Sequence, residues 1–138
     1  MFEKNPVVQQ WLEALIAAEG GVAGSVHVQR GRDLFLVATH NLPPPVVQIV
    51  AVVPHGKGMA GAAQVKKAPV QTCNLKSDDS GVVRPGAKAV DAQAAIALPV
   101  LDSAGEVRAV VGIAWAGEGA ISADREQALM EKAGGLPT

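Results

Sequence analysis

The chain has 138 residues, with 12 Lys and Arg against 13 Asp and Glu, and a formal net charge of −1. This length suits one domain, residues 1–138, with one hydrophobic core and no room for a second domain. Because the charges nearly cancel and no basic cluster stands out, we expect no nucleic-acid partner.

Cysteine usage and the N-terminus favour the cytoplasm. Cys73 is the only cysteine, which excludes an internal disulfide and a multi-cysteine zinc site and fits a reducing compartment. Residues 1–10 lack the form of a secretory signal, and the longest apolar runs are too short to span a bilayer. We therefore expect a soluble cytoplasmic protein. Since the chain has two Trp, two Phe and no Tyr, any ligand pocket should be mostly aliphatic.

The first predicted element is an amphipathic helix over residues 5–19. Asn5 is its candidate N-cap, Pro6 occupies the first helical position, and apolar residues then recur at steps of three and four. The apolar stripe, which includes Trp11, must cover either a sheet or a partner subunit.

A β-hairpin is predicted next, with strands over residues 22–29 and 34–39. His27 lies on the polar face of the first strand, where we expect it to be solvated. Three prolines end the hairpin, and residues 46–50 follow as a short helix or an extended segment, between which the periodicity does not decide.

A glycine-rich stretch over residues 54–66 is the most informative segment. Gly56, Gly58 and Gly61 let the backbone turn sharply and approach another backbone or a ligand, and the alanines that follow favour a helix. The N-terminal amides of such a helix could receive an anion or the polar edge of a ligand. The alternative is a tight turn that packs a short helix onto a sheet.

The rest of the chain completes an α+β pattern. Residues 69–72 form a short strand, and residues 74–91 form a long polar loop of a kind that is often functional. Strands over residues 95–101 and 106–115 make a second hairpin, and Ser122 caps a final helix over residues 122–134. The short connections make the central sheet antiparallel.

From about residue 22 to residue 133 the chain resembles the GAF domain family. The resemblance rests on the first hairpin, on His55–Gly61 leading into a small-residue helix, on the second hairpin with Pro99, and on Ser122 opening the last helix. It implies a PAS-like antiparallel sheet of about six strands, with the terminal helices on one face and a ligand pocket on the other. It also implies a homodimer formed through the helices at residues 5–19 and 122–134.

One enzymatic branch looks close, the free methionine-R-sulfoxide reductases, which use a nucleophilic and a resolving cysteine. One cysteine of that family falls in the glycine segment, where this chain has Ala60. The catalytic one falls in a Pro-Gly-x-x-Ala-Cys-Asp pattern, which residues 85–91 match except for Val90. Cys73 lies at neither position, so we expect no reductase activity of that kind.

Other branches of the family match less well. The chain lacks the Asn-Lys-Phe-Asp-Glu signature of the cyclic-nucleotide-binding members, and Cys73 is not in the setting of a bilin-attachment cysteine. Haem would need an axial ligand; His55 is available, but a polar loop role suits it better. We expect no cofactor and no metal.

The resemblance places the ligand-binding residues in the glycine loop, its helix and the long loop. The candidates are His55, Lys57, Met59, Gln64, Cys73, Leu75, Arg84 and Asp91. Lys57 and Arg84 could bind a carboxylate or phosphate, although for each residue taken alone a solvated surface charge is the favoured interpretation. Cys73 reads most simply as a small buried apolar residue.

Three functions remain open from the sequence. The leading hypothesis is a free-standing GAF-type sensor that binds a small molecule and signals through a protein partner. The second is a structural dimerisation module whose pocket is filled. The third is an enzyme of unrecognised chemistry that uses Cys73 as its nucleophile.

Overall fold

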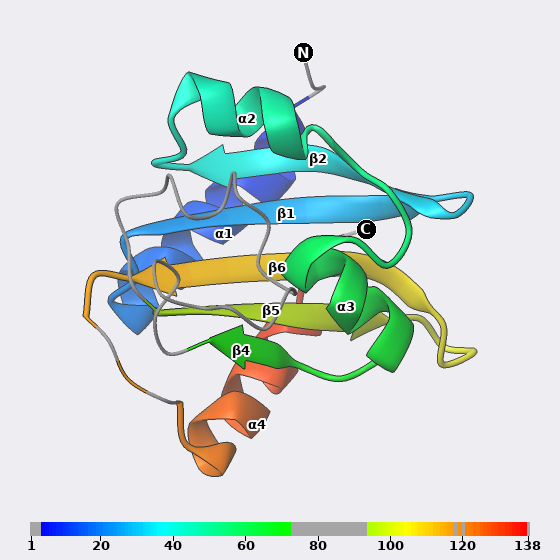
Figure 1. The fold of residues 1–138 in the computed structure, drawn as a ribbon. Helices are drawn as coiled ribbons and strands as arrows, with labels where there is room; N and C mark the ends of the chain where they lie inside the picture. The colour runs from blue at the N-terminus through cyan, green and yellow to red at the C-terminus, as the bar shows by residue number, and fades with distance from the viewer. Residues whose placement is uncertain (1–3, 73–93, 118, 120, 138) are drawn as a thin grey trace.

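The computed structural model describes residues 4–72, 94–117, 119 and 121–137. Its core is a six-stranded antiparallel sheet in the order β3-β2-β1-β6-β5-β4 (Figure 1). The strands are β1 (Ala23–Arg30), β2 (Asp33–His40), β3 (Val52–Val53), β4 (Val70–Thr72), β5 (Ala94–Leu101) and β6 (Val107–Trp115). The helices are α1 (Pro6–Glu19), α2 (Pro44–Val50), α3 (Gly58–Lys66) and α4 (Ala123–Ala133). The α+β architecture with an antiparallel sheet is confirmed.

The helices divide between the two faces of the sheet, as Figure 1 shows. In this view α1 lies behind the sheet, α4 begins below β4 and runs behind the sheet, and α3 lies in front of β5 and β6. Large aliphatic side chains of the central strands pack against α1 and α4; they include Val26, Ile96, Leu98, Val111 and Ile113. The predicted arrangement, with both terminal helices on one face, is therefore confirmed.

The apolar stripe of α1 covers the sheet of its own chain. Leu12, Leu15 and Ile16 are buried in the core between α1 and the sheet, and Trp11 packs against that core half-buried. This settles the alternative left open by the sequence, because residues buried in this core are not available to a partner subunit. Asn5 caps the helix as predicted, its side chain accepting from two first-turn amides.

Residues 46–50, which the periodicity left undecided, belong to α2. Pro44 stands in the first turn of this helix, where the fixed φ of proline suits the helix and its missing amide hydrogen is not needed. Strand β3 was not predicted, because two residues are too few to show an alternating pattern.

The prediction that His27 is solvated is wrong. Its side chain is 4% exposed, and Nε2 donates to the carbonyl oxygen of Val50, 2.8 Å away. Val50 ends α2, so the bond ties that helix to β1. Alternation had placed His27 on the correct face of β1, but that face is covered by α2 and α3 rather than by solvent.

Two wider findings hold for the residues described. No helix among them is long and apolar enough to cross a membrane. The same part of the chain contains no cluster of His, Cys, Asp and Glu that could hold a metal ion.

Candidate functional site

The glycine stretch forms the turn that leads into α3, as the sequence predicted. Gly56 and Gly58 have φ values of +77° and +64°, in the left-handed region that other residues avoid. Gly61 has a different role, since a Cβ there would lie 2.5 Å from the carbonyl carbon of Gly56. The first turn of α3 is thus in direct backbone contact with the loop that precedes it.

Gln64 holds this loop in place from the other side of α3. Its side chain is 5% exposed, and its Oε1 accepts from the amide of Gly56 at 3.4 Å. Its Nε2 donates to the carbonyl oxygen of Arg32 at 2.8 Å and to Oε1 of Gln29 at 3.1 Å. One buried side chain therefore connects the glycine loop, α3 and the turn between β1 and β2.

A cavity of about 150 Å³ lies between the sheet and the two helices α2 and α3. Its floor is the face of β1, β6 and β5 opposite to α1 and α4, and its walls include Val46, Val50 and Met59. Nearly all of the described lining is aliphatic, which confirms the expectation drawn from the scarcity of aromatic residues.

Two adjacent rows of small residues make up the cavity floor. One row pairs Ala23 with Ala114 and Ala114 with Ala95, and the other pairs Ser25 with Gly112 and Gly112 with Ala97. In β5 and β6 these small residues alternate with the large aliphatic residues that face α1 and α4. The cavity exists because the central strands carry large side chains on one face and small ones on the other.

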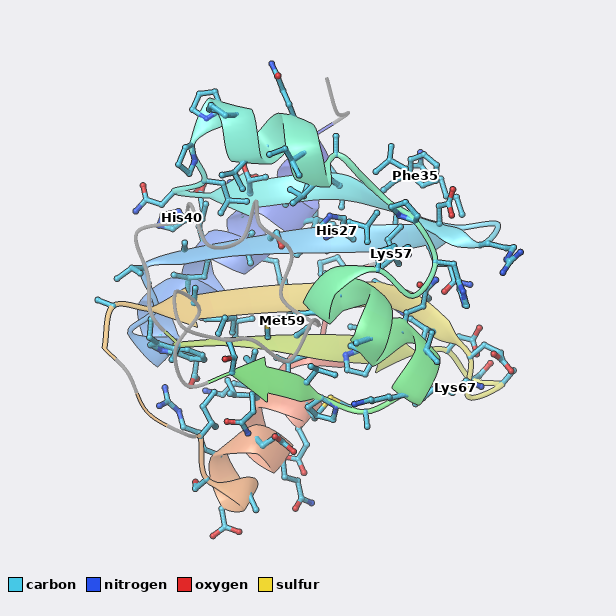
Figure 2. All side chains as sticks on the ribbon, viewed as in Figure 1. His27, Phe35, His40, Lys57, Met59 and Lys67 are labelled. Atoms are coloured by element: carbon cyan, nitrogen blue, oxygen red, sulfur yellow. The ribbon has the colours of Figure 1, made fainter. Side chains whose placement is uncertain are left out.

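Three polar side chains contribute to the described cavity lining, those of Ser25, His27 and Lys57. His27 is bonded to the end of α2, and the exposed Lys57 precedes α3. Gly58, Met59 and Ala60, the first three residues of α3, also line the cavity, and their amides are not needed for the hydrogen bonds of the helix. Figure 2 shows His27, Lys57 and Met59 together at this end of α3, with Lys67 at the other.

The predicted site residues fall into three groups. Lys57 and Met59 line the cavity. His55 and Gln64 instead line a second hollow of about 210 Å³, together with Lys67 and other residues beyond α3. The remaining four lie outside the residues that the structure describes: Cys73, Leu75, Arg84 and Asp91.

The cavity floor was missed by reasoning from the sequence. The sequence nevertheless contains a pattern that could have revealed it. Small residues occupy every second position in β5 (Ala95, Ala97) and in β6 (Gly112, Ala114), and both strands were predicted. Of the two reductase positions, Ala60 lines the cavity and brings no thiol to it, whereas Val90 lies outside the described residues.

The sequence matches no protein-family model and no curated protein. Its structure is similar to several solved structures. The GAF domain of a phosphoenolpyruvate-protein phosphotransferase from Coxiella burnetii is 18% identical, with a TM-score of 0.75 over 94% of this chain and 79% of that one.

Two free methionine-R-sulfoxide reductases are similar to the same degree. The enzyme from Neisseria meningitidis, solved in complex with its substrate, is 16% identical, with a TM-score of 0.73 over 91% of this chain and 71% of its own. The type II enzyme from Thermoplasma acidophilum is 20% identical, with a TM-score of 0.71 over 91% of this chain and 83% of its own. At such identities the likeness concerns the fold and not the activity. Together with the six-stranded sheet and its two helical layers, these similarities show that the chain has the GAF fold.

Proposed function

We propose that the chain is a GAF-type regulatory domain that binds a small molecule in the cavity between the sheet and α3. The observation that carries this proposal is the cavity floor, where six small residues leave space on the face that α3 covers. Interiors are normally close-packed, so an apolar cavity of about 150 Å³ is space that a ligand could fill.

Lys57 and the start of α3 support a ligand with an anionic end. Lys57 is the one charged side chain among the described residues that line the cavity. The first amides of α3 are directed along the helix axis, and the helix dipole favours negative charge at this end. We propose that an anionic group of the ligand lies at this rim, while the rest of the molecule contacts the aliphatic walls.

The test is a thermal-shift screen of metabolites on the wild-type protein and on two variants. Ala97→Leu places a larger side chain on the cavity floor, and Ala128→Leu makes the same change on the exposed side of α4. A true ligand raises the Tm of the wild type and of Ala128→Leu but not that of Ala97→Leu. If no compound stabilises the wild type, or if every stabiliser acts equally on Ala97→Leu, the proposal is wrong.

We also propose that the chain signals through a protein partner and forms a homodimer. The exposed side of α1, opposite its buried stripe, is the proposed dimer surface. Val7, Ala14 and Ala18 recur at steps of seven and four on the exposed side of α1, and Val7 is 62% exposed. Sedimentation should show a dimer for the wild type and a monomer for Ala14→Arg. Gln48→Arg, an exposed change on α2, is the control and should remain a dimer.

We propose no catalytic role for the chain. Ala60 stands in the cavity wall, where the resembling reductases have a cysteine, and alanine has no redox chemistry. Incubation with free methionine sulfoxide and dithiothreitol should therefore yield no methionine. Alkylation of Cys73 by iodoacetamide should be no faster at neutral pH than that of a model thiol, and a faster reaction would revive the enzymatic alternative.

A further inference from the structure

Ser25 places a hydroxyl group on the cavity floor. A Cβ at Gly24 would meet the side chain of Ile16 in α1, so position 24 faces the terminal helices and position 25 faces the cavity. A Cβ at Gly112 would lie 3.1 Å from the Oγ of Ser25, which shows that both positions share one face. Because residue 112 is a glycine, no side chain covers this hydroxyl from β6.

Within the described residues the hydroxyl of Ser25 has no hydrogen-bond partner. The two other polar side chains of the lining are placed differently, since His27 Nε2 is bonded to the carbonyl oxygen of Val50 and Lys57 is exposed. A hydroxyl group in a largely aliphatic cavity gains free energy from any partner that enters with a ligand. The cavity floor is therefore apolar apart from the hydroxyl group of Ser25, which is available to hydrogen-bond a ligand.

We propose that the buried end of the ligand is a compact, uncharged, largely apolar group with one hydrogen-bonding atom, which Ser25 binds. This inference rests on the proposed function, since it concerns the same cavity. A cavity of about 150 Å³ holds a group of about the size of benzene, so a whole nucleotide does not fit inside it. A charged group is excluded from the floor because the described floor residues carry no opposite charge to compensate its lost hydration.

Toluene and phenol test the inference, because they are nearly equal in shape and differ in a methyl and a hydroxyl group. Their Kd values are measured on the full chain by NMR titration. We expect phenol to bind the wild type about three- to tenfold more tightly than toluene, the range of one net hydrogen bond. In Ser25→Ala the preference for phenol should be lost, because its hydroxyl group is then buried without this partner.

The ratio of the Kd values of toluene and phenol does not change if part of a variant is unfolded. Both probes are measured on the same preparation, so the unfolded fraction affects both Kd values equally. Ser25→Cys is the second variant; it keeps the shape of the serine side chain but hydrogen-bonds weakly, so its ratio should also fall. Ala97→Leu should weaken both probes together, which locates them in the cavity, and Ala128→Leu should weaken neither.

Four outcomes overturn the inference: equal binding of both probes to the wild type, an unchanged ratio in the two Ser25 variants, binding unaffected by Ala97→Leu, or binding of neither probe. A metabolite that stabilises the wild type but not Ala97→Leu would in each of these cases leave the proposed function standing and exclude only this class of ligand. If the metabolite screen and both probes fail alike, the cavity is not a binding site and the proposed function falls with the inference.

Discussion

Replacing Gly61 by Ala tests the contact between α3 and the glycine loop, because two effects of opposite sign compete there. Alanine is the better helix former by about 1 kcal/mol, so helix propensity alone predicts a gain in stability. The new Cβ, however, would lie 2.5 Å from the carbonyl carbon of Gly56 and 3.0 Å from its Cα and N. Carbon atoms pack best at about 3.5–4.0 Å, so the loop would have to move by about 1 Å.

Movement of the loop is opposed by the bonds that fix it, which include the hydrogen bond from the amide of Gly56 to Gln64. Overpacking of this kind costs about 1–3 kcal/mol. After the gain in helix propensity, we expect Gly61→Ala to lower the free energy of unfolding by up to about 2 kcal/mol. The Tm should fall by up to about 8 °C, at about 4 °C per kcal/mol for a chain of this size.

Urea unfolding measures the change, and Ala62→Gly is the matched control. The control removes a helix-forming methyl group from the next residue and should cost about 1 kcal/mol without displacing the loop. Hydrogen exchange separates the two variants, since the amide of Lys57 donates to Pro54 at 3.0 Å within the loop. That amide should exchange faster in Gly61→Ala than in Ala62→Gly. A Gly61→Ala protein more stable than the wild type would refute the close contact.

Three further substitutions test single contacts, each by urea unfolding. Gln64→Leu leaves the carbonyl oxygen of Arg32 without its side-chain donor and should cost about 1–3 kcal/mol; a loss below about 0.5 kcal/mol would show that the buried bonds contribute little. Glu19→Gln weakens the ion pair with Lys132 that joins α1 to α4. Since the Lys132 side chain is half exposed, the loss of stability should be at most about 1 kcal/mol, and it should vanish in 1 M salt. Asn5→Ala removes the N-cap of α1 and should cost about 1 kcal/mol, whereas Asn5→Asp should retain most of the stability.

The central strands and terminal helices could be predicted because their own residues determine them. In β5 and β6 the aliphatic alternation is long, and α1 carries its cap, its apolar stripe and its terminal glycine in one segment. The burial of His27 could not be predicted in this way. It depends on α2, a helix of seven residues joined to β1 only through the fold, and so short a helix shows no clear period.

The resemblance assigned the candidate site to whole elements, and the sequence did not show which face of α3 each residue occupies. Met59 and Gln64 lie five residues apart on α3, which places them about 140° apart around the helix axis. Met59 consequently lines the cavity, whereas Gln64 lines the second hollow. Ser25 could not be singled out from the sequence, since its importance depends on its pairing with Gly112 in a distant strand.

The small residues of the cavity floor also distinguish a binding site from a filled, purely structural pocket. Each buried methylene group contributes about 0.8 kcal/mol, so larger side chains on the floor would stabilise a domain that had only to fold. We therefore expect Ala97→Leu to raise the free energy of unfolding of the ligand-free protein by about 1–2 kcal/mol while abolishing ligand binding. Urea unfolding and the metabolite screen measure the two effects, with Ala128→Leu expected to change neither. A destabilised Ala97→Leu protein would mean that the space above β5 is already filled, and the structural dimerisation module would then become the better account of the chain.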